Sequence, residues 1–242
     1  MVYVAALINT TGAQQIRVPT GINRNVKLYF MKQAFTLIEL MVVIAIIALL
    51  LAIMVPALAI AHEQAKVVAV NCELRQIALT LVMYMDDNNS KPPPTRTDCN
   101  LGWEDHQLPP ELVTRGYLPP PPPGQNMSTG MEDRFHPDHT YRYWSVGELY
   151  QNSQYMRNKS SRLWVPSGFP LLQSDQGCWE TDPKTSPVTW VIYSQGPKFD
   201  SWKMKQAKYP VPTNTWYNPQ TRTGVITRIR LLNGKHVGSF ER

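Results

Sequence analysis

The sequence predicts an α+β fold in which a long N-terminal helix packs across a C-terminal antiparallel sheet. An apolar run of membrane-spanning length, residues 40–61, predicts the first half of this helix. Apolar side chains at three- and four-residue steps over residues 67–85 predict its second half. From Thr140 onward, short alternating or β-branched segments predict strands. About 150 residues follow the helix, which is enough for one hydrophobic core, so we expect one globular domain.

The first 34 residues are basic. They contain four Lys or Arg residues and no acid, so they carry +4 of the formal net charge of +6. A basic flank before a spanning segment stays in the cytoplasm, which predicts that the C-terminal part lies on the other side of the membrane. The pI near 9.2 therefore arises mostly from this basic flank, which reports the orientation of the chain in the membrane. Because no basic cluster follows residue 34, we expect no nucleic-acid partner.

The apolar run opens with Phe-Thr-Leu-Ile-Glu at residues 35–39. Glu39 is the only ionisable side chain between Lys32 and His62. A carboxylate beside such a segment is unfavourable when it has no partner, so we expect Glu39 to interact with a partner group. Pro56 removes a backbone donor and clashes with the preceding turn, which predicts a kink in the helix.

The second half of the helix is amphipathic. We expect one apolar face, formed by Val67, Val70, Leu74, Ile77, Ala78, Leu81, Tyr84 and Met85. Asn88, Asn89 and the prolines at 92–94 should end the helix, because Asn tolerates a left-handed cap and Pro cannot continue the ladder. A helix from Phe35 to Asp87 would be about 80 Å long at 1.5 Å per residue.

Beyond the helix, we expect residues 92–139 to be irregular, with the five prolines at 119–123 in an extended polyproline conformation. The later segments predict strands at 141–146, 188–193 and 224–232. Asn233-Gly234 is a strong two-residue turn signal and predicts a hairpin into residues 236–238.

Residues 32–39, Lys-Gln-Ala-Phe-Thr-Leu-Ile-Glu, resemble the processing site of type IV prepilins and type II secretion pseudopilins. The resemblance implies a membrane peptidase that cuts between Ala34 and Phe35 and then methylates the new Phe35 amine. It also implies that Glu39 pairs with the N-terminal amine of a neighbouring subunit, since a paired charge is tolerated in an apolar core where an isolated one is not. Pro56 matches a kinking proline that is common in the family. Ala34 departs from the family's preferred Gly, and it is the next smallest residue.

The resemblance implies a structural subunit of a pilin-like filament, and not an enzyme. We expect a type II secretion pseudopilin, whose partners would be the prepilin peptidase and methyltransferase, other pilin or pseudopilin subunits, an inner-membrane assembly platform and the membrane. The chain would cross the bacterial inner membrane once, with the filament in the periplasm or at the cell surface. The expected segments are a cytoplasmic leader (1–34), a transmembrane helix (35–61), its amphipathic continuation (62–91) and a periplasmic region (92–242). Family leaders are often short, so Met31 is a second candidate for the start.

Two later segments carry a looser resemblance. Residues 112–119 resemble the segment that follows the long helix in the major pseudopilin. Residues 233–238 resemble the tail of prepilin-like proteins with an H-x9-DG signature, although Asn233 replaces the Asp and Lys235 intervenes. We therefore carry over the hairpin and no site from that tail.

Other functions are compatible with the same residues. A type IV pilus subunit shares the processing motif. Small-x-small patterns at 57–59 and 59–61 fit ordinary signal peptidase, which would release a soluble protein, but the apolar stretch exceeds the usual 7–15 residues. A plain signal anchor is a third alternative. From another class, a membrane-anchored or secreted periplasmic enzyme or binding protein could use the seven Trp and eleven Tyr for stacking, although the sequence has no nucleophile elbow and no phosphate loop.

Candidate metal ligands are few. The run from His136 to His139 could bind a metal together with Asp105 and His106, but it lacks helical i,i+4 spacing, so we expect a solvated loop. Some pseudopilin domains bind calcium in a C-terminal loop. Here the candidate acids are too far apart in sequence for one ligand loop; they are Asp175, Asp182 and Asp200. We expect no cofactor, with calcium as the weaker alternative.

The chain has three cysteines, an odd number for an oxidising compartment. Cys99 and Cys178 both lie in the loop-and-strand region and are the better pair for a disulfide. We expect Cys72 to be a small buried helix residue.

Overall fold

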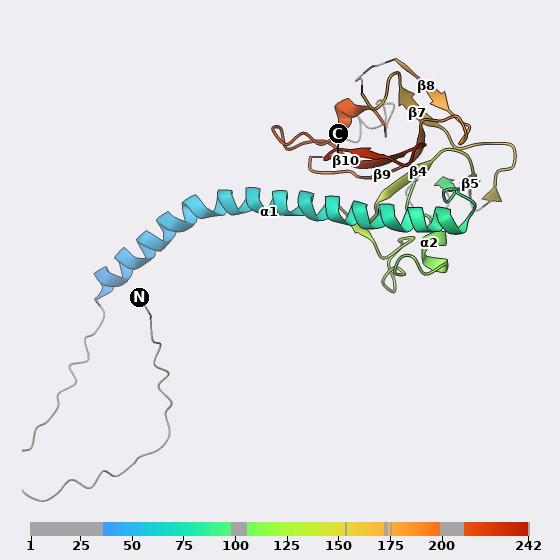
Figure 1. The fold of residues 1–242 in the computed structure, drawn as a ribbon. Coiled ribbons are helices and arrows are strands. Elements are labelled where there is room, and N and C mark those ends of the chain that lie inside the picture. The colour runs from blue at the N-terminus through green and yellow to red at the C-terminus, as the bar shows by residue number, and fades with distance from the viewer. Residues whose placement is uncertain are drawn as a thin grey trace, which may run out of the picture. The chain divides into compact units, whose positions relative to one another are not determined.

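The computed structural model describes residues 36–97, 106–152, 154–171, 174, 176–198 and 211–241. The chain divides into two compact units, residues 1–50 and residues 51–242. The helix α1, Leu37–Asp87, begins in the first unit and ends in the second. The strands and the short helices all belong to the second unit (Figure 1).

α1 is one uninterrupted helix of 51 residues, which confirms the expected continuity of the apolar and amphipathic segments. Its apolar part has a mean hydropathy of 3.1 over 18 residues, none of them buried, so α1 is long and apolar enough to cross a membrane. Pro56 lies inside α1, and the kink expected there stays a prediction.

The C-terminal end of α1 follows the expected chemistry. Asn89 and Ser90 have positive φ angles of 54° and 61°, so the chain turns left-handed directly after the helix. The Ser90 N–H donates to the Met85 carbonyl at 2.8 Å, and the Asn88 side-chain amide donates to the Tyr84 carbonyl at 2.6 Å. These bonds satisfy carbonyls that the end of the helix would otherwise leave without a donor.

The main sheet has four strands in the order β11-β10-β9-β4, and every neighbouring pair is antiparallel. The strands are β4 (Arg142–Ser145), β9 (Val188–Ser194), β10 (Ile226–Leu231) and β11 (His236–Gly238). The turn at Asn233-Gly234 joins β10 to β11, so the predicted hairpin is confirmed. The three longer strand predictions are confirmed as well, with shifts of one or two residues at their ends.

Shorter elements surround this sheet. They are β1 (Thr95–Thr97), β5 (Leu149–Gln151) and β6 (Gln154–Tyr155) in one sheet, the pairs β2 (Glu132–Asp133) with β3 (His136–Thr140) and β7 (Leu163–Pro166) with β8 (Gly177–Glu180), the helix α2 (Glu111–Thr114) and the 3-10 helix η1 (Thr213–Thr215). The expectation that residues 92–139 are irregular is therefore wrong in part, because β1, α2, β2 and β3 lie there. Elements of two to five residues are too short for the spacing of apolar side chains to reveal a helix or a strand. The prolines at 119–123 form neither helix nor strand, and the polyproline conformation expected there stays a prediction.

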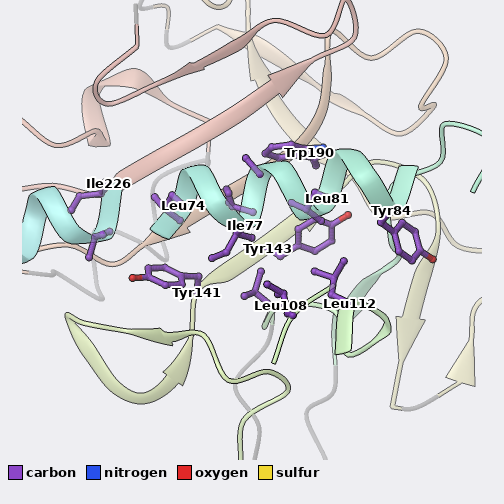
Figure 2. Packing of buried hydrophobic residues seen from close by; sticks show 14 of the residues in the cluster. Leu74, Ile77, Leu81, Tyr84, Leu108, Leu112, Tyr141, Tyr143, Trp190 and Ile226 are labelled. Carbon is purple, nitrogen blue, oxygen red and sulfur yellow. The ribbon is translucent and has the colours of Figure 1, made fainter. Parts of the chain in front are cut away.

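The core forms on both faces of the main sheet. One face carries Trp190, Ile192 and Ile226 and packs against α1. All eight α1 residues predicted to be buried are buried. On its other side, α1 packs against Leu108 and Leu112 of residues 108–114, which we call the α2 segment, so it lies between that segment and the sheet (Figure 2). The opposite face of the sheet forms a second cluster; its members include Val146, Leu163, Val165, Val191, Tyr193, Trp216, Ile229 and Val237.

Candidate processing and assembly site

Glu39 lies in the first turn of α1, and its carboxylate turns back towards residue 36. The backbone N–H and the hydroxyl of Thr36 both donate to Glu39 Oε2, at 2.8 and 2.9 Å. In return, the Glu39 N–H donates to Thr36 Oγ1 at 3.3 Å. Thr36 is therefore the N-cap of α1 and Glu39 is its N3 residue, which is the arrangement known as a capping box.

The capping box was missed in the sequence analysis, although its signal is present. The pattern Thr-x-x-Glu directly before an apolar run is the sequence signature of this motif. Glu39 therefore has a local structural role in the single chain, because it satisfies one of the backbone donors that the first turn leaves free. Its negative charge also lies at the positive end of the helix dipole.

The same bonds determine which oxygen of the carboxylate accepts. Both hydrogen bonds from Thr36 go to Oε2, and among the described residues none goes to Oε1. The neighbouring side chains are apolar and exposed: Leu37 is 76% exposed, and Ile38 is 70% exposed. A charged group is thus held in a fixed direction on a surface that otherwise has no polar side chain nearby in the helix.

The predicted cut site lies just before this motif. Ala34 and Phe35 are outside the described residues. Cleavage between them, and methylation of Phe35, therefore stay predictions. What the structure adds is the position of Thr36, which would be the second residue of a chain that starts at Phe35.

In the second unit, charged side chains of α1 bind residues that lie between or after the strands. Glu73 accepts hydrogen bonds from the Arg134 guanidinium (Nε–Oε1, 2.7 Å) and from the Tyr141 hydroxyl. Burial, together with the neighbouring Glu73 carboxylate, raises the pKa of Tyr141. Near the C-terminus, Glu241 pairs with Arg75 of α1 at 3.3 Å and with Arg228 of β10. These pairs position the helix on the domain.

A buried carboxylate attaches the β2–β3 hairpin to the end of β9. Asp133 is 1% exposed and accepts hydrogen bonds from the Ser194 hydroxyl at 2.6 Å and from the Gln195 N–H at 3.1 Å. Burial raises the pKa of Asp133, although these hydrogen bonds act in the opposite direction. The Phe135 N–H also donates to this carboxylate, to Oδ1 at 3.0 Å.

The candidate metal ligands do not gather in the part of the chain that the structure describes. No group of three or more His, Cys, Asp or Glu side chains among these residues could hold an ion. The run from His136 to His139 belongs to strand β3 and not to a solvated loop, so that expectation is wrong; the two rings stack with centroids 3.7 Å apart. His106 instead stacks on Trp144. Outside the described residues lie Asp105, Asp175 and Asp200.

The cysteines differ in part from expectation. Cys72 is exposed, and not buried, because it lies two residues before the buried Leu74 and so on the opposite side of the helix. Cys178 is exposed on β8, where its thiol donates to Glu180 Oε1 at 3.0 Å, and this bond raises the thiol pKa. Cys99 lies outside the described residues, so a disulfide between Cys99 and Cys178 stays a prediction.

Comparison with known proteins supports the reading of the N-terminal region. The family model for the prokaryotic N-terminal methylation motif matches residues 30–55. The chain is 45% identical over 58 residues to the type IV wide pilus major component PilA4 of Thermus thermophilus, covering 24% of this chain and 44% of that protein. It is 41% identical over 61 residues to the type II secretion system core protein G of Pseudomonas aeruginosa, covering 25% of this chain and 43% of that protein. The chain thus spans less than half the length of both relatives, and no solved structure matches it significantly.

Proposed function

We propose that this chain is a structural, non-catalytic subunit of a pilin-like filament, and specifically a type II secretion pseudopilin. One observation carries the proposal: within the matched methylation motif, a capping box fixes Glu39 at the start of an exposed, apolar helix. The helix continues without a break into a segment that packs on the sheet of the domain. One helix therefore joins a membrane-compatible segment to a folded domain.

Processing is the first step of the proposed function. A prepilin peptidase would cut between Ala34 and Phe35 and methylate the Phe35 amine. Ala34 is the next smallest residue after the family's Gly, so the peptidase has to accommodate a single added methyl group at this position. The cut would leave the whole of α1 on the mature protein, because α1 begins at Leu37.

Assembly is the second step. The Glu39 carboxylate would pair with the Phe35 amine of a neighbouring subunit, which neutralises both charges in the apolar centre of the filament. The capping box supports this role, because it holds the carboxylate at the first turn of α1 and, among the described residues, leaves Oε1 without a hydrogen bond. Thr36 is then a positioning residue for Glu39.

The charge distribution supports the orientation. The basic leader would stay in the cytoplasm, and the sheet domain would face the periplasm. Other subunits, the prepilin peptidase and an inner-membrane assembly platform are the proposed partners. No cofactor is part of the proposal.

Mass spectrometry of the mature N-terminus tests the proposal. The full chain, expressed together with a prepilin peptidase and extracted from membranes, should begin at a methylated Phe35. Ala34→Gly should speed the cut, and Ala34→Leu should block it. A mature protein beginning at His62 would contradict the proposal and support an ordinary secretory signal.

A type IV pilus subunit is the second candidate, favoured by the similarity to PilA4 of Thermus thermophilus. The two relatives match nearly the same number of residues, so the motif alone does not separate the two filaments. Deletion of the gene separates them. A pseudopilin is required for protein export across the outer membrane, whereas a pilus subunit is required for fibres on the cell surface.

A further inference from the structure

The five prolines at 119–123 are a feature of the sequence that the proposed function does not use. They lie on the surface of the domain, where four of them are exposed and Pro121 is partly buried. The run follows Leu118, which is buried and whose N–H donates to the Leu112 carbonyl at 2.9 Å. The prolines therefore start from a fixed point of the domain and contact solvent along most of their length.

The prolines form the outgoing arm of a loop that returns to its own starting point. The Gly130 N–H donates to the Pro119 carbonyl at 2.8 Å, so the two ends of the loop are bonded to each other. The return arm, residues 127–129, is buried, and within it the Ser128 N–H donates to the side chain of the buried Gln107 at 3.1 Å. A surface loop of this length whose ends are close is an Ω-loop, and such loops frequently carry function.

The outgoing arm is stiff. Proline fixes its own φ and restricts the residue before it to extended conformations, so consecutive prolines favour the polyproline helix. A turn ends the run: the Gln125 N–H donates to the Pro122 carbonyl at 3.2 Å, and Gly124 has a φ of 85°, which suits the third position of a type II turn. A stiff segment acts as a spacer where it separates two domains, but both ends of this loop meet on one domain. Its stiffness instead lowers the entropy that is lost when a partner binds.

The loop offers a partner apolar rings and backbone acceptors, and no charge. The sequence has no charged side chain between Arg115 and Glu132. Proline has no backbone N–H, and neither the Pro120 nor the Pro121 carbonyl accepts a hydrogen bond from a residue that the structure describes. Such a surface is complementary to aromatic side chains, whose rings pack on the pyrrolidine rings while an indole N–H or a phenol O–H donates to the carbonyls.

We propose that residues 119–123 are the ligand for a groove on a different protein, lined by aromatic side chains that donate hydrogen bonds to the proline carbonyls. The proposal goes beyond the proposed function, because it adds a partner that binds the Ω-loop and not α1. Because the loop carries no charge, the groove needs no ionic anchor. Two pockets of this chain do not supply such a groove in a second copy: the pocket beside Leu171 contains one aromatic ring, Trp216, and the pocket beside Glu73 contains none.

Photocrosslinking of the full chain, in cells that carry its assembly machinery, tests the proposal. A benzoylphenylalanine in place of Gln125 lies next to the proline run, and the same group in place of Gln220 lies on an exposed turn elsewhere in the domain. The first position should crosslink to one protein that the second does not reach, within a segment that contains Trp or Tyr. The combined substitutions Pro120→Ala, Pro121→Ala and Pro122→Ala should lower this crosslink by about tenfold or more, because ring contacts and stiffness are lost.

A synthetic peptide separates recognition from the folding of the variant. A peptide of residues 116–126 should compete with the crosslink and change the aromatic fluorescence of the purified partner, whereas the same peptide with Ala at positions 120–122 should do neither.

Four outcomes would overturn the proposal. They are no crosslinked protein specific to position 125, a crosslink that persists without the three prolines, a crosslink to a second copy of this chain, and a partner whose fluorescence the peptide leaves unchanged. Each of them leaves the proposed function intact, because that function is read from the methylated Phe35 and from entry of the parent chain into filaments. Absence of the processed parent chain from every filament would overturn the proposed function alone.

Discussion

Two leucines on opposite faces of α1 give the sharpest test of how the domain is built. Leu74 is fully buried between the sheet and the α2 segment, whereas Leu79, five residues later, is 65% exposed. The same substitution to alanine at both positions removes the same atoms from the same helix. Helix propensity changes equally in the two variants, so the difference between them reports burial alone.

The structure predicts a large difference in the free energy of unfolding. Leu74→Ala should cost about 3 kcal/mol, because it loses transfer free energy and leaves a cavity among fully buried neighbours. Leu79→Ala should change stability by less than about 0.5 kcal/mol, since the side chain is mostly in water already. For a domain of this size, 3 kcal/mol corresponds to a fall in Tm of about 6–12 °C.

The assay is thermal and urea unfolding of residues 62–242, which we expect to fold as a soluble domain without catalytic activity. The apolar spanning part of α1 is absent from this fragment, and the buried face of the remaining helix is covered by its own domain. Equal destabilisation by the two substitutions would refute the one-sided packing of α1. Hydrolysis of a glycan, ester or peptide by the fragment, abolished by one point mutation, would refute the structural role.

Three further predictions concern single residues. Glu39→Ala should insert into the membrane normally but fail to enter filaments, because the partner of the Phe35 amine is lost; crosslinking would detect normal assembly if the pairing is wrong. A disulfide between Cys99 and Cys178 should appear in non-reducing peptide maps of periplasmic material, and free thiols at both positions or a Cys72 bridge would contradict it. Burial, with Arg228 and Arg230 nearby, lowers the pKa of His236, so the folded state binds its proton less readily than the unfolded state does. Stability should therefore fall as the pH drops from about 7 to 5, through the ordinary His pKa of about 6.5; His236→Gln should fold but show a shallower fall, and an unchanged slope would exclude this contribution.

The sequence predicts α1 well because α1 is long. Eight buried positions repeat over five turns, so the period is unmistakable and no competing pattern fits. The strands β9 and β10 are also predictable, since each is a continuous run of six or seven residues rich in β-branched and aromatic side chains. The turn at Asn233-Gly234 fixes their neighbour β11 through local chemistry alone.

The short strands and the buried polar contacts depend on residues that are far apart in the sequence, so a local sequence pattern does not predict them. β1 pairs in parallel with β5, more than 50 residues later, and neither strand has more than three residues. Burial of Asp133 follows from the donors of Ser194 and Gln195, which only the fold brings together. The exposure of Cys72 is different, because the helical period that predicted its buried neighbours already places it on the opposite face.

The position of α1 between the sheet and the α2 segment determines how the protein would carry a mechanical load (Figure 2). Tension on the membrane end of α1 acts along the helix axis, parallel to both surfaces that enclose the helix. Such a pull loads the eight buried side chains in shear at the same moment, and they cannot be peeled away one at a time. Extraction of the helix from its domain would require the whole contact to slip together.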